Sequence, residues 1–169
     1  IEAENPERMV EQQLDAASAR SLAELEDAHV HEHRSWYRRM DFKLAAESEE
    51  VVALSIPERI KRVGEAGLKV DPGLLVTAFH HRRYLQIAAS RPGSIPSNLQ
   101  GIWNYQFNPP WNSDFHPNIN LQMNYWPAET VNLPETVEPL IDWLEAIVAP
   151  GQRTAEVHYG CRGWVLHHV

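Results

Sequence analysis

The chain has 169 residues, of which 43% are hydrophobic, a length and composition with which a single domain can bury a sizeable core. Its formal net charge of -8 argues against binding to nucleic acid or to an anionic membrane surface, because both need clustered lysine and arginine. The sequence contains no apolar run of about eighteen residues, so it predicts no membrane-spanning helix. A single cysteine, Cys161, excludes an internal disulfide framework.

Both ends of the chain indicate a piece of a longer protein. Ile1 opens it without an initiator methionine or a signal peptide, and Val169 closes it inside a polar and aromatic segment that lacks a helix terminator. We therefore expect residues 1–169 to form a single partial domain.

Residues 5–43 have the apolar spacing of one long helix or of two, with Asn5 as the cap. Within this stretch His29 and His33 lie four residues apart, on one face of a helix, where they could chelate zinc. No cysteine or suitably spaced carboxylate completes a ligand set, so a polar helix surface is the favoured interpretation. The sequence predicts neither a metal nor a cofactor.

Local signals predict two further helices before position 94. Residues 55–58 have the spacing of a capping box, which opens a helix that ends near Gly64 or Gly67. Asp71, as a cap followed by proline, begins a second helix that the turn at residues 91–93 ends.

The rest of the chain combines a long loop with short helices. Residues 94–117 show little periodicity and predict an ordered loop, after which a short helix begins at Asn120. A clear apolar stripe follows Pro134, with a break at Pro150-Gly151 and a short helix over residues 153–159. Since no strand pattern competes, the fold class is all-α.

Aromatic and amide side chains crowd into residues 98–126. Flat apolar rings, set among amides that both donate and accept hydrogen bonds, suit a surface that binds a neutral polyol, so the segment indicates a sugar site. It holds seven of the fifteen aromatic residues: Trp103, Tyr105, Phe107, Trp111, Phe115, Tyr125 and Trp126.

Asn118 and Asn120 are separated by one residue. On an extended segment they would lie on the same side and could direct both amides at one water molecule or one sugar hydroxyl. They could equally cap the helix that enters at Leu121. Trp103, Trp111 and Trp126 also have two interpretations. Each could be a platform on which a sugar ring stacks, or a large residue of the core.

Sugar hydrolysis requires two carboxylates that flank the scissile bond, and their separation decides the stereochemical outcome. The candidates in or near the aromatic segment are Asp114, Glu129 and Glu135. A single sequence does not supply the distances between them.

The same segment carries three motifs, which read I-P-S-N-L-Q-G-I-W-N over residues 95–104, N-P-P-W over 108–111 and N-I-N-L-Q-M-N-Y-W-P-A-E over 118–129. They resemble the inverting α-L-fucosidases of glycoside hydrolase family 95. Further segments resemble that family too: residues 29–44, R-Y-L at 83–85, S-R-P-G at 90–93, and Y-G-C-R-G-W at 159–164 with His167 and His168.

The resemblance implies a partial (α/α)6 barrel, the N-terminal portion of a catalytic domain that releases terminal α-1,2-linked fucose with inversion and without a metal. It assigns Asn118 and Asn120 to the attacking water and His116 to recognition of fucose. The substrate-binding set is then His116, Trp103, Trp111, Trp126, His167 and His168. The Glu and Asp that act in the family lie downstream of this chain, so the chain alone is expected to be inactive.

The implied partners are a fucosylated oligosaccharide or glycan and the remainder of the same catalytic domain, and the resemblance favours a secreted or periplasmic location. Two alternatives come from other functional classes. One is a catalytically silent carbohydrate-binding module, which the missing carboxylates would permit. The other is a helical interaction fragment, in which the helix over residues 5–43 pairs with another chain.

Overall fold

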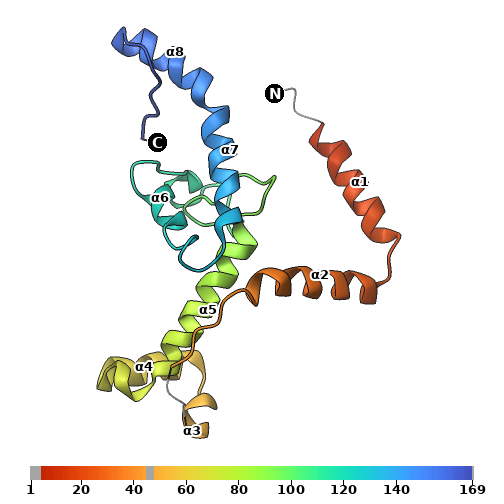
Figure 1. Ribbon diagram of the computed structural model, residues 1–169, viewed down its shortest axis with the longest axis vertical. Helices are drawn as coiled ribbons and strands as arrows, with labels where there is room; N and C mark the ends of the chain where they lie inside the picture. The colour runs from red at the N-terminus through yellow and green to blue at the C-terminus, as the bar shows by residue number, and fades with distance from the viewer. Residues whose placement is uncertain (1–4, 45–47, 169) are drawn as a thin grey trace. The chain divides into compact units, whose positions relative to one another are not determined.

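The computed structural model of the protein describes residues 5–44 and 48–168 (Figure 1). Ile1 and Val169, on which the expectation about the chain ends rests, lie outside the described residues. The chain divides into two compact units, residues 1–38 and 39–169. The described residues form helices and loops without a strand, which confirms the all-α prediction.

The first unit holds two helices, α1 (Pro6–Ser18) and α2 (Leu22–Tyr37), so the second of the two expected arrangements is confirmed. Ser21 explains the division, because it forms a capping box: its hydroxyl accepts from the Glu24 N–H at 3.3 Å and its own N–H donates to the Glu24 carboxylate at 2.8 Å. Neither helix contains a buried residue.

The second unit begins with α3 (Glu49–Val52), α4 (Ile56–Ala66), a 3-10 turn η1 (Leu68–Val70) and α5 (Pro72–Ala89). The capping signals at residues 55–58 and at Asp71 are confirmed as the starts of α4 and α5. The short helix α3 and the turn η1 were not predicted, because elements of three or four residues give no periodicity to read.

Asp71 joins the two helices that flank it. Its carboxylate accepts the Leu74 N–H at 3.0 Å as the cap of α5, and it receives Arg59 of α4 in a bidentate pair at 2.6 and 2.8 Å. Both side chains are buried. Hydrogen bonds from Arg59 hold the pKa of the Asp71 carboxyl below its usual range, so the pair stays ionised.

The remaining elements are η2 (Pro110–Ser113), α6 (Asn120–Tyr125), η3 (Pro134–Val137), α7 (Glu138–Ala146) and α8 (Val148–Tyr159). The short helix from Asn120 is confirmed. The predicted break at Pro150-Gly151 is wrong, because the chain bends at Ile147 and both residues lie in the first turn of α8. Proline is harmless there, since the first N–H groups of a helix have no partner within it.

The core of the second unit forms where α5, α6 and η3 meet, and Figure 1 shows α6 beside the region where α5 approaches α7. Ile87, Leu121 and Leu133 are almost completely buried. Arg83 is buried with them and donates to the backbone oxygens of Val131 at 3.3 Å and Met40 at 3.1 Å. A buried guanidinium thus ties two loops to α5.

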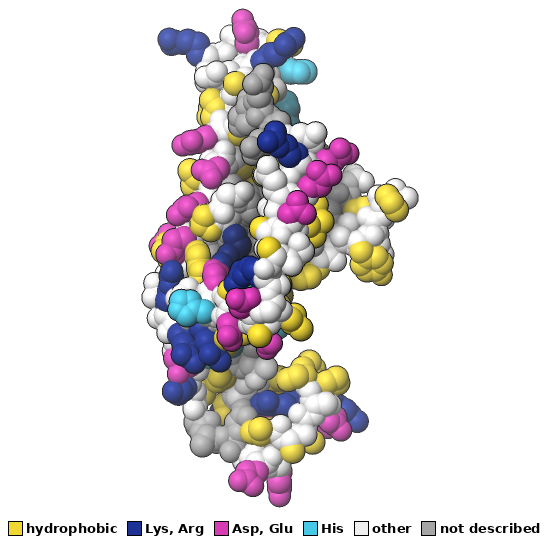
Figure 2. Space-filling model, turned by 90° about the vertical axis from the view of Figure 1, so that its right-hand side faces the viewer, with side chains coloured by type: hydrophobic (Ala, Val, Ile, Leu, Met, Phe, Trp, Pro, Cys, Tyr) yellow, Lys and Arg dark blue, Asp and Glu magenta, His cyan; other side chains and the backbone are white. Residues whose placement is uncertain are grey.

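On the face drawn in Figure 2, lysine and arginine side chains alternate with aspartate and glutamate. No helix in the described parts of the chain is both long and apolar enough to cross a membrane.

Candidate functional site

The loop after α5 is fixed by a buried network of hydroxyl groups. The Tyr125 hydroxyl accepts the Ser97 N–H at 2.9 Å and lies 2.8 Å from the Ser90 hydroxyl, which donates to the Thr136 carbonyl at 2.8 Å. The Ser97 hydroxyl bonds in turn to the Ala89 carbonyl at 3.3 Å. One tyrosine therefore joins α6, the end of α5 and η3.

The network continues into a tight turn over residues 98–101. The Asn124 amide donates to the carbonyls of Ser97 and Asn98 at 3.4 and 3.2 Å, and the Asn98 side chain accepts the Gln100 N–H at 2.8 Å. Gly101 closes the turn with φ +65° and donates to the Asn98 carbonyl at 3.0 Å. Glycine suits this left-handed position.

A groove of about 550 Å³ lies between α5, this turn and α6, and we call it the α5–α6 groove. Trp103 forms one wall, and its ring packs against Gly101 so closely that a β-carbon there would lie 2.5 Å from the ring. The other lining residues are Arg82, Leu85, Gln86, Ala89, Ser97, Asn98, Leu99, Gln100, Met123, Asn124 and Pro127.

Backbone strain concentrates in the loop that leads to the asparagine pair. Four non-glycine residues within six positions have φ between 48° and 56°: Trp111, Asn112, Ser113 and His116. Each such residue costs on the order of 1–3 kcal/mol and persists only where its surroundings enforce it. Ser113 is held through its hydroxyl, which donates to the Gln100 side chain.

His116 organises the turn that precedes α6. Its carbonyl oxygen accepts the N–H groups of Ile119 at 3.4 Å and Leu121 at 3.3 Å. Its ring lies edge-on to the His168 ring, with centroids 4.7 Å apart. The Nε2 atom of His116 is buried and has no hydrogen-bond partner among the described residues, which is uncommon for a buried polar atom.

The residues after α8 fold back along that helix and bring His168 to His116. The Val165 N–H donates to the Gly151 carbonyl at 3.1 Å, and a β-carbon at Gly151 would lie 3.1 Å from the Trp164 ring. The Tyr159 hydroxyl lies 2.8 Å from His167 Nε2. Close approach of the returning chain explains the glycine inside α8.

Asn118 and Asn120 occupy different local structures. Asn118 lies in the turn and Asn120 is the first residue of α6, so the expected extended segment is wrong. The capping alternative is wrong as well, because Ile119 holds the cap position and no side chain caps the helix. Both asparagines are exposed, and their amides bond to no described residue.

The structure divides the predicted substrate-binding residues into groups. His116 and His168 are in contact, and His167 is tied to Tyr159 beside them. Trp103 belongs to the α5–α6 groove instead. Trp111 and Trp126 are 72% and 64% exposed and line no described pocket, so neither is a core residue.

Sequence reasoning missed Gly101 and Met123 as parts of the groove, and it missed Tyr159 as the partner of His167. The signal that could have found Gly101 is its position in the turn just before Trp103. Nothing local marks the other two residues, because their roles depend on contacts between separate segments.

The candidate carboxylates have different surroundings. The Glu135 carboxylate accepts hydrogen bonds from Arg39 Nη1 at 2.7 and 2.8 Å. The pKa of Glu135 is lowered by a hydrogen bond from its own backbone and by Arg39. A carboxylate held ionised in this way is a poor general acid. Glu129 is exposed, and the Asp114 carbonyl accepts the Leu99 N–H at 3.1 Å.

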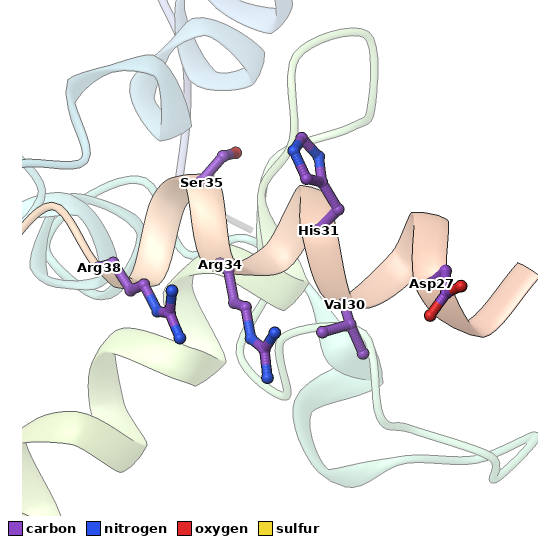
Figure 3. Close-up of a pocket in the computed structure, with 6 residues that line it drawn as sticks. All are labelled: Asp27, Val30, His31, Arg34, Ser35 and Arg38. Carbon is purple, nitrogen blue, oxygen red and sulfur yellow. The ribbon is translucent and has the colours of Figure 1, made fainter.

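Two of the histidines of α2 stack on each other. The His29 and His33 rings stack with centroids 6.3 Å apart, and the described residues include no group of three or more His, Cys, Asp or Glu that could hold a metal. A shallow hollow on α2 lies within the first unit (Figure 3) and includes none of the predicted site residues. It is lined by Asp27, Val30, His31, Arg34, Ser35 and Arg38.

Comparison with known proteins identifies relatives along almost the whole chain. Alpha-L-fucosidase 2 of Arabidopsis thaliana is 39% identical over 149 residues, which cover 88% of this chain and 18% of that protein. Probable alpha-fucosidase A of Aspergillus niger is 36% identical over 166 residues, or 97% of this chain and 20% of that protein. The chain thus spans about a fifth of the length of these relatives.

The model of the glycosyl hydrolase family 95 catalytic domain matches residues 21–169. This match covers α2, the α5–α6 groove, the strained loop and the asparagine pair. The chain therefore belongs to glycosyl hydrolase family 95.

Proposed function

We propose that this chain forms part of the active site of an α-L-fucosidase that releases terminal α-1,2-linked fucose from glycans with inversion. The alpha-fucosidase names of its relatives support the reaction class. We retain the prediction that residues 1–169 are the N-terminal portion of one (α/α)6 catalytic domain, which the remainder of that domain completes. A binding module without catalysis is not favoured, because the family and its named members are hydrolases.

The observation that carries the proposal is the placement of Asn118 in the turn before α6 and of Asn120 as the first residue of α6, both exposed and with amides that bond to no described residue. Inversion requires a water molecule that attacks the anomeric carbon from the face opposite the leaving group. An amide oxygen accepts a hydrogen bond from that water and so orients a lone pair of the water toward the anomeric carbon. Two amides restrict its orientation more than one, which lowers the entropic part of the barrier.

Proton transfer needs a general acid and a general base, whose carboxyl groups stand about 6.5–9.5 Å apart in inverting enzymes. We assign both roles to carboxylates outside this chain, since Glu135 is engaged by Arg39. The chain alone should then have no measurable hydrolytic activity.

The substrate-binding roles follow the groups described above. His116 offers a buried, unpaired Nε2 to a fucose hydroxyl, and the His168 ring packs edge-on against it. His167 contributes a second imidazole beside this pair. Trp111 and Trp126 present exposed rings, on which the apolar face of a sugar can stack.

The experiment is substitution of Asn118→Ala and Asn120→Ala in the full-length protein, with 2′-fucosyllactose as substrate. Each change should lower kcat by about 10²-fold while KM changes little, because the water loses its orientation and the sugar keeps its contacts. Proton NMR of freshly released fucose should detect the β-anomer first, as inversion demands.

Asn5→Ala is the matched control, since it removes an exposed amide at the start of α1, outside the residues that the family model matches. It should retain wild-type kcat. Wild-type turnover in both Asn118→Ala and Asn120→Ala would contradict the proposed role of the pair.

A further inference from the structure

The α5–α6 groove is lined by residues that lie one helical turn after Asn120. Met123 and Asn124 line it, and they follow Asn120 by three and four residues on α6, so all three share one face of that helix. At a rise of about 1.5 Å per residue, Asn120 and Asn124 are about 6 Å apart along the axis. A ligand held at Asn120 therefore reaches the groove within about one helical turn.

The groove has a fixed aromatic wall. The Trp103 ring rests against Gly101, and its residue remains 48% exposed, so part of the ring is open to a ligand. The turn beneath it is held by two backbone hydrogen bonds, from Gly101 to Asn98 at 3.0 Å and from Trp103 to Gln100 at 3.2 Å. An aromatic platform that is already in place costs little ordering entropy on binding.

The opposite wall comes from one face of α5, where the lining residues follow helical spacing. Leu85 and Ala89 are apolar, whereas Arg82 and Gln86 carry hydrogen-bond donors, and the amides of Asn98 and Gln100 add polar groups from the turn. A sugar ring has an apolar face and a rim of hydroxyl groups. A groove with one aromatic wall and dispersed donors matches that chemistry.

The buried hydroxyl network sets the width of the groove. Tyr125 ties α6 to Ser90 and Ser97, and the Asn124 amide spans to the carbonyls of Ser97 and Asn98. Both walls are therefore fixed to the same helix that begins with Asn120.

We propose that the α5–α6 groove is a sugar subsite, which binds the residues of the glycan on the leaving-group side of the terminal fucose, with Trp103 as the stacking platform. The proposal rests on the proposed function, since it assigns the fucose itself to the asparagine pair and His116. The ligand class is a neutral, unbranched oligosaccharide such as the lactose unit of 2′-fucosyllactose.

The test compares two substrates in the full-length protein. In 2′-fucosyllactose the leaving group is a disaccharide, whereas in α-L-fucosyl fluoride it is a single atom that cannot fill a groove. Gly101→Ala places a methyl group where the Trp103 ring lies and displaces the platform. The ratio of kcat/KM for 2′-fucosyllactose to that for the fluoride should fall roughly tenfold, because only the longer substrate uses the platform.

Gly93→Ala is the matched control. Gly93 also has a positive φ, +82°, but a β-carbon there meets no atom within 4 Å, so the change adds backbone strain and displaces nothing. Its ratio should equal that of the wild type. Trp103→Ala serves as a second variant that adds no backbone strain, and it should lower the ratio as Gly101→Ala does.

Lactose alone gives a readout that does not require turnover of a fucosylated sugar. It should inhibit hydrolysis of the fluoride competitively or bind in calorimetry, and Trp103→Ala should weaken that binding roughly tenfold. If the protein hydrolyses both substrates and the ratio of kcat/KM values stays constant in Gly101→Ala and Trp103→Ala, the groove is not a subsite for the leaving group. If neither substrate is hydrolysed by the wild-type protein, the proposed function itself fails.

Discussion

The two units of the chain are stabilised in different ways. In residues 5–38, Asn5, Ser18 and Ser21 form hydrogen bonds with partners two or three positions away, and neither helix has a buried residue. In the second unit, side chains also join segments far apart in the sequence, as in the bonds of Ser97 with Tyr125, 28 positions away, and of Gln86 with Thr136, 50 positions away. Hydrogen bonds between near neighbours in the sequence stabilise a single helix, whereas hydrogen bonds between distant segments fix the position of one segment against another.

The sharpest test of this contrast is removal of the buried ion pair in the second unit. Asp71→Ala removes the carboxylate that pairs with the buried Arg59 guanidinium, and it also removes the cap of α5. We expect the opening free energy of α4 and α5 to fall by about 3–5 kcal/mol. Hydrogen exchange of peptides from these helices, read by mass spectrometry, measures that change locally.

The control is Glu65→Ala, which removes an exposed partner of Lys61 at 4.0 Å and should change the opening free energy by less than about 1 kcal/mol.

Lowering the pH should destabilise α4 and α5 as Asp71→Ala does. The pKa of Asp71 is lowered in the folded state, so its stabilising contribution is complete above the unfolded value of about 3.9 and declines as the pH falls below it. Equal exchange rates in Asp71→Ala and the wild type would show that the Arg59–Asp71 pair does not stabilise the second unit.

The hydroxyl network gives the second test, of intermediate size. Tyr125→Phe keeps the ring in place but leaves the buried Ser97 N–H without its acceptor, which costs about 1–3 kcal/mol. Exchange should accelerate in peptides that cover residues 96–104 and α6, and hardly at all in α2. Tyr105→Phe removes the same atom from a loop residue that is 90% exposed, and it should leave the loop protected.

The predictability of each element follows the same division. Capping signals at Asn5, Ser55 and Asp71 were read correctly, because an N-cap bond is made within three residues and is visible in the sequence. The bend at Ile147 was placed three residues late, since proline was taken to end a helix although it also suits a first turn.

The site was predictable in composition but not in arrangement. Motifs marked residues 98–126 and their asparagines as the candidate site, whereas the separation of Trp103 from the histidine group depends on contacts of α5 and of the segment after α8. Left-handed residues at Trp111 and His116 were equally invisible, because the surroundings and not the residue type impose them. Non-local contacts decide what local patterns leave open.

The smallest expected effect comes from a helix cap in the first unit. Ser21→Ala removes the side-chain acceptor at the start of α2 and should cost about 1 kcal/mol of helix stability. Ser18→Ala is its control, because the Ser18 hydroxyl only returns a bond to the Asp15 carbonyl and alanine is the better helix former. Exchange should quicken in the first turn of α2 in Ser21→Ala alone and remain unchanged in α5 in both variants. Faster exchange in α5 would mean that the two units are energetically coupled, and the distinction between local and distant stabilisation would no longer follow the boundary at residue 38.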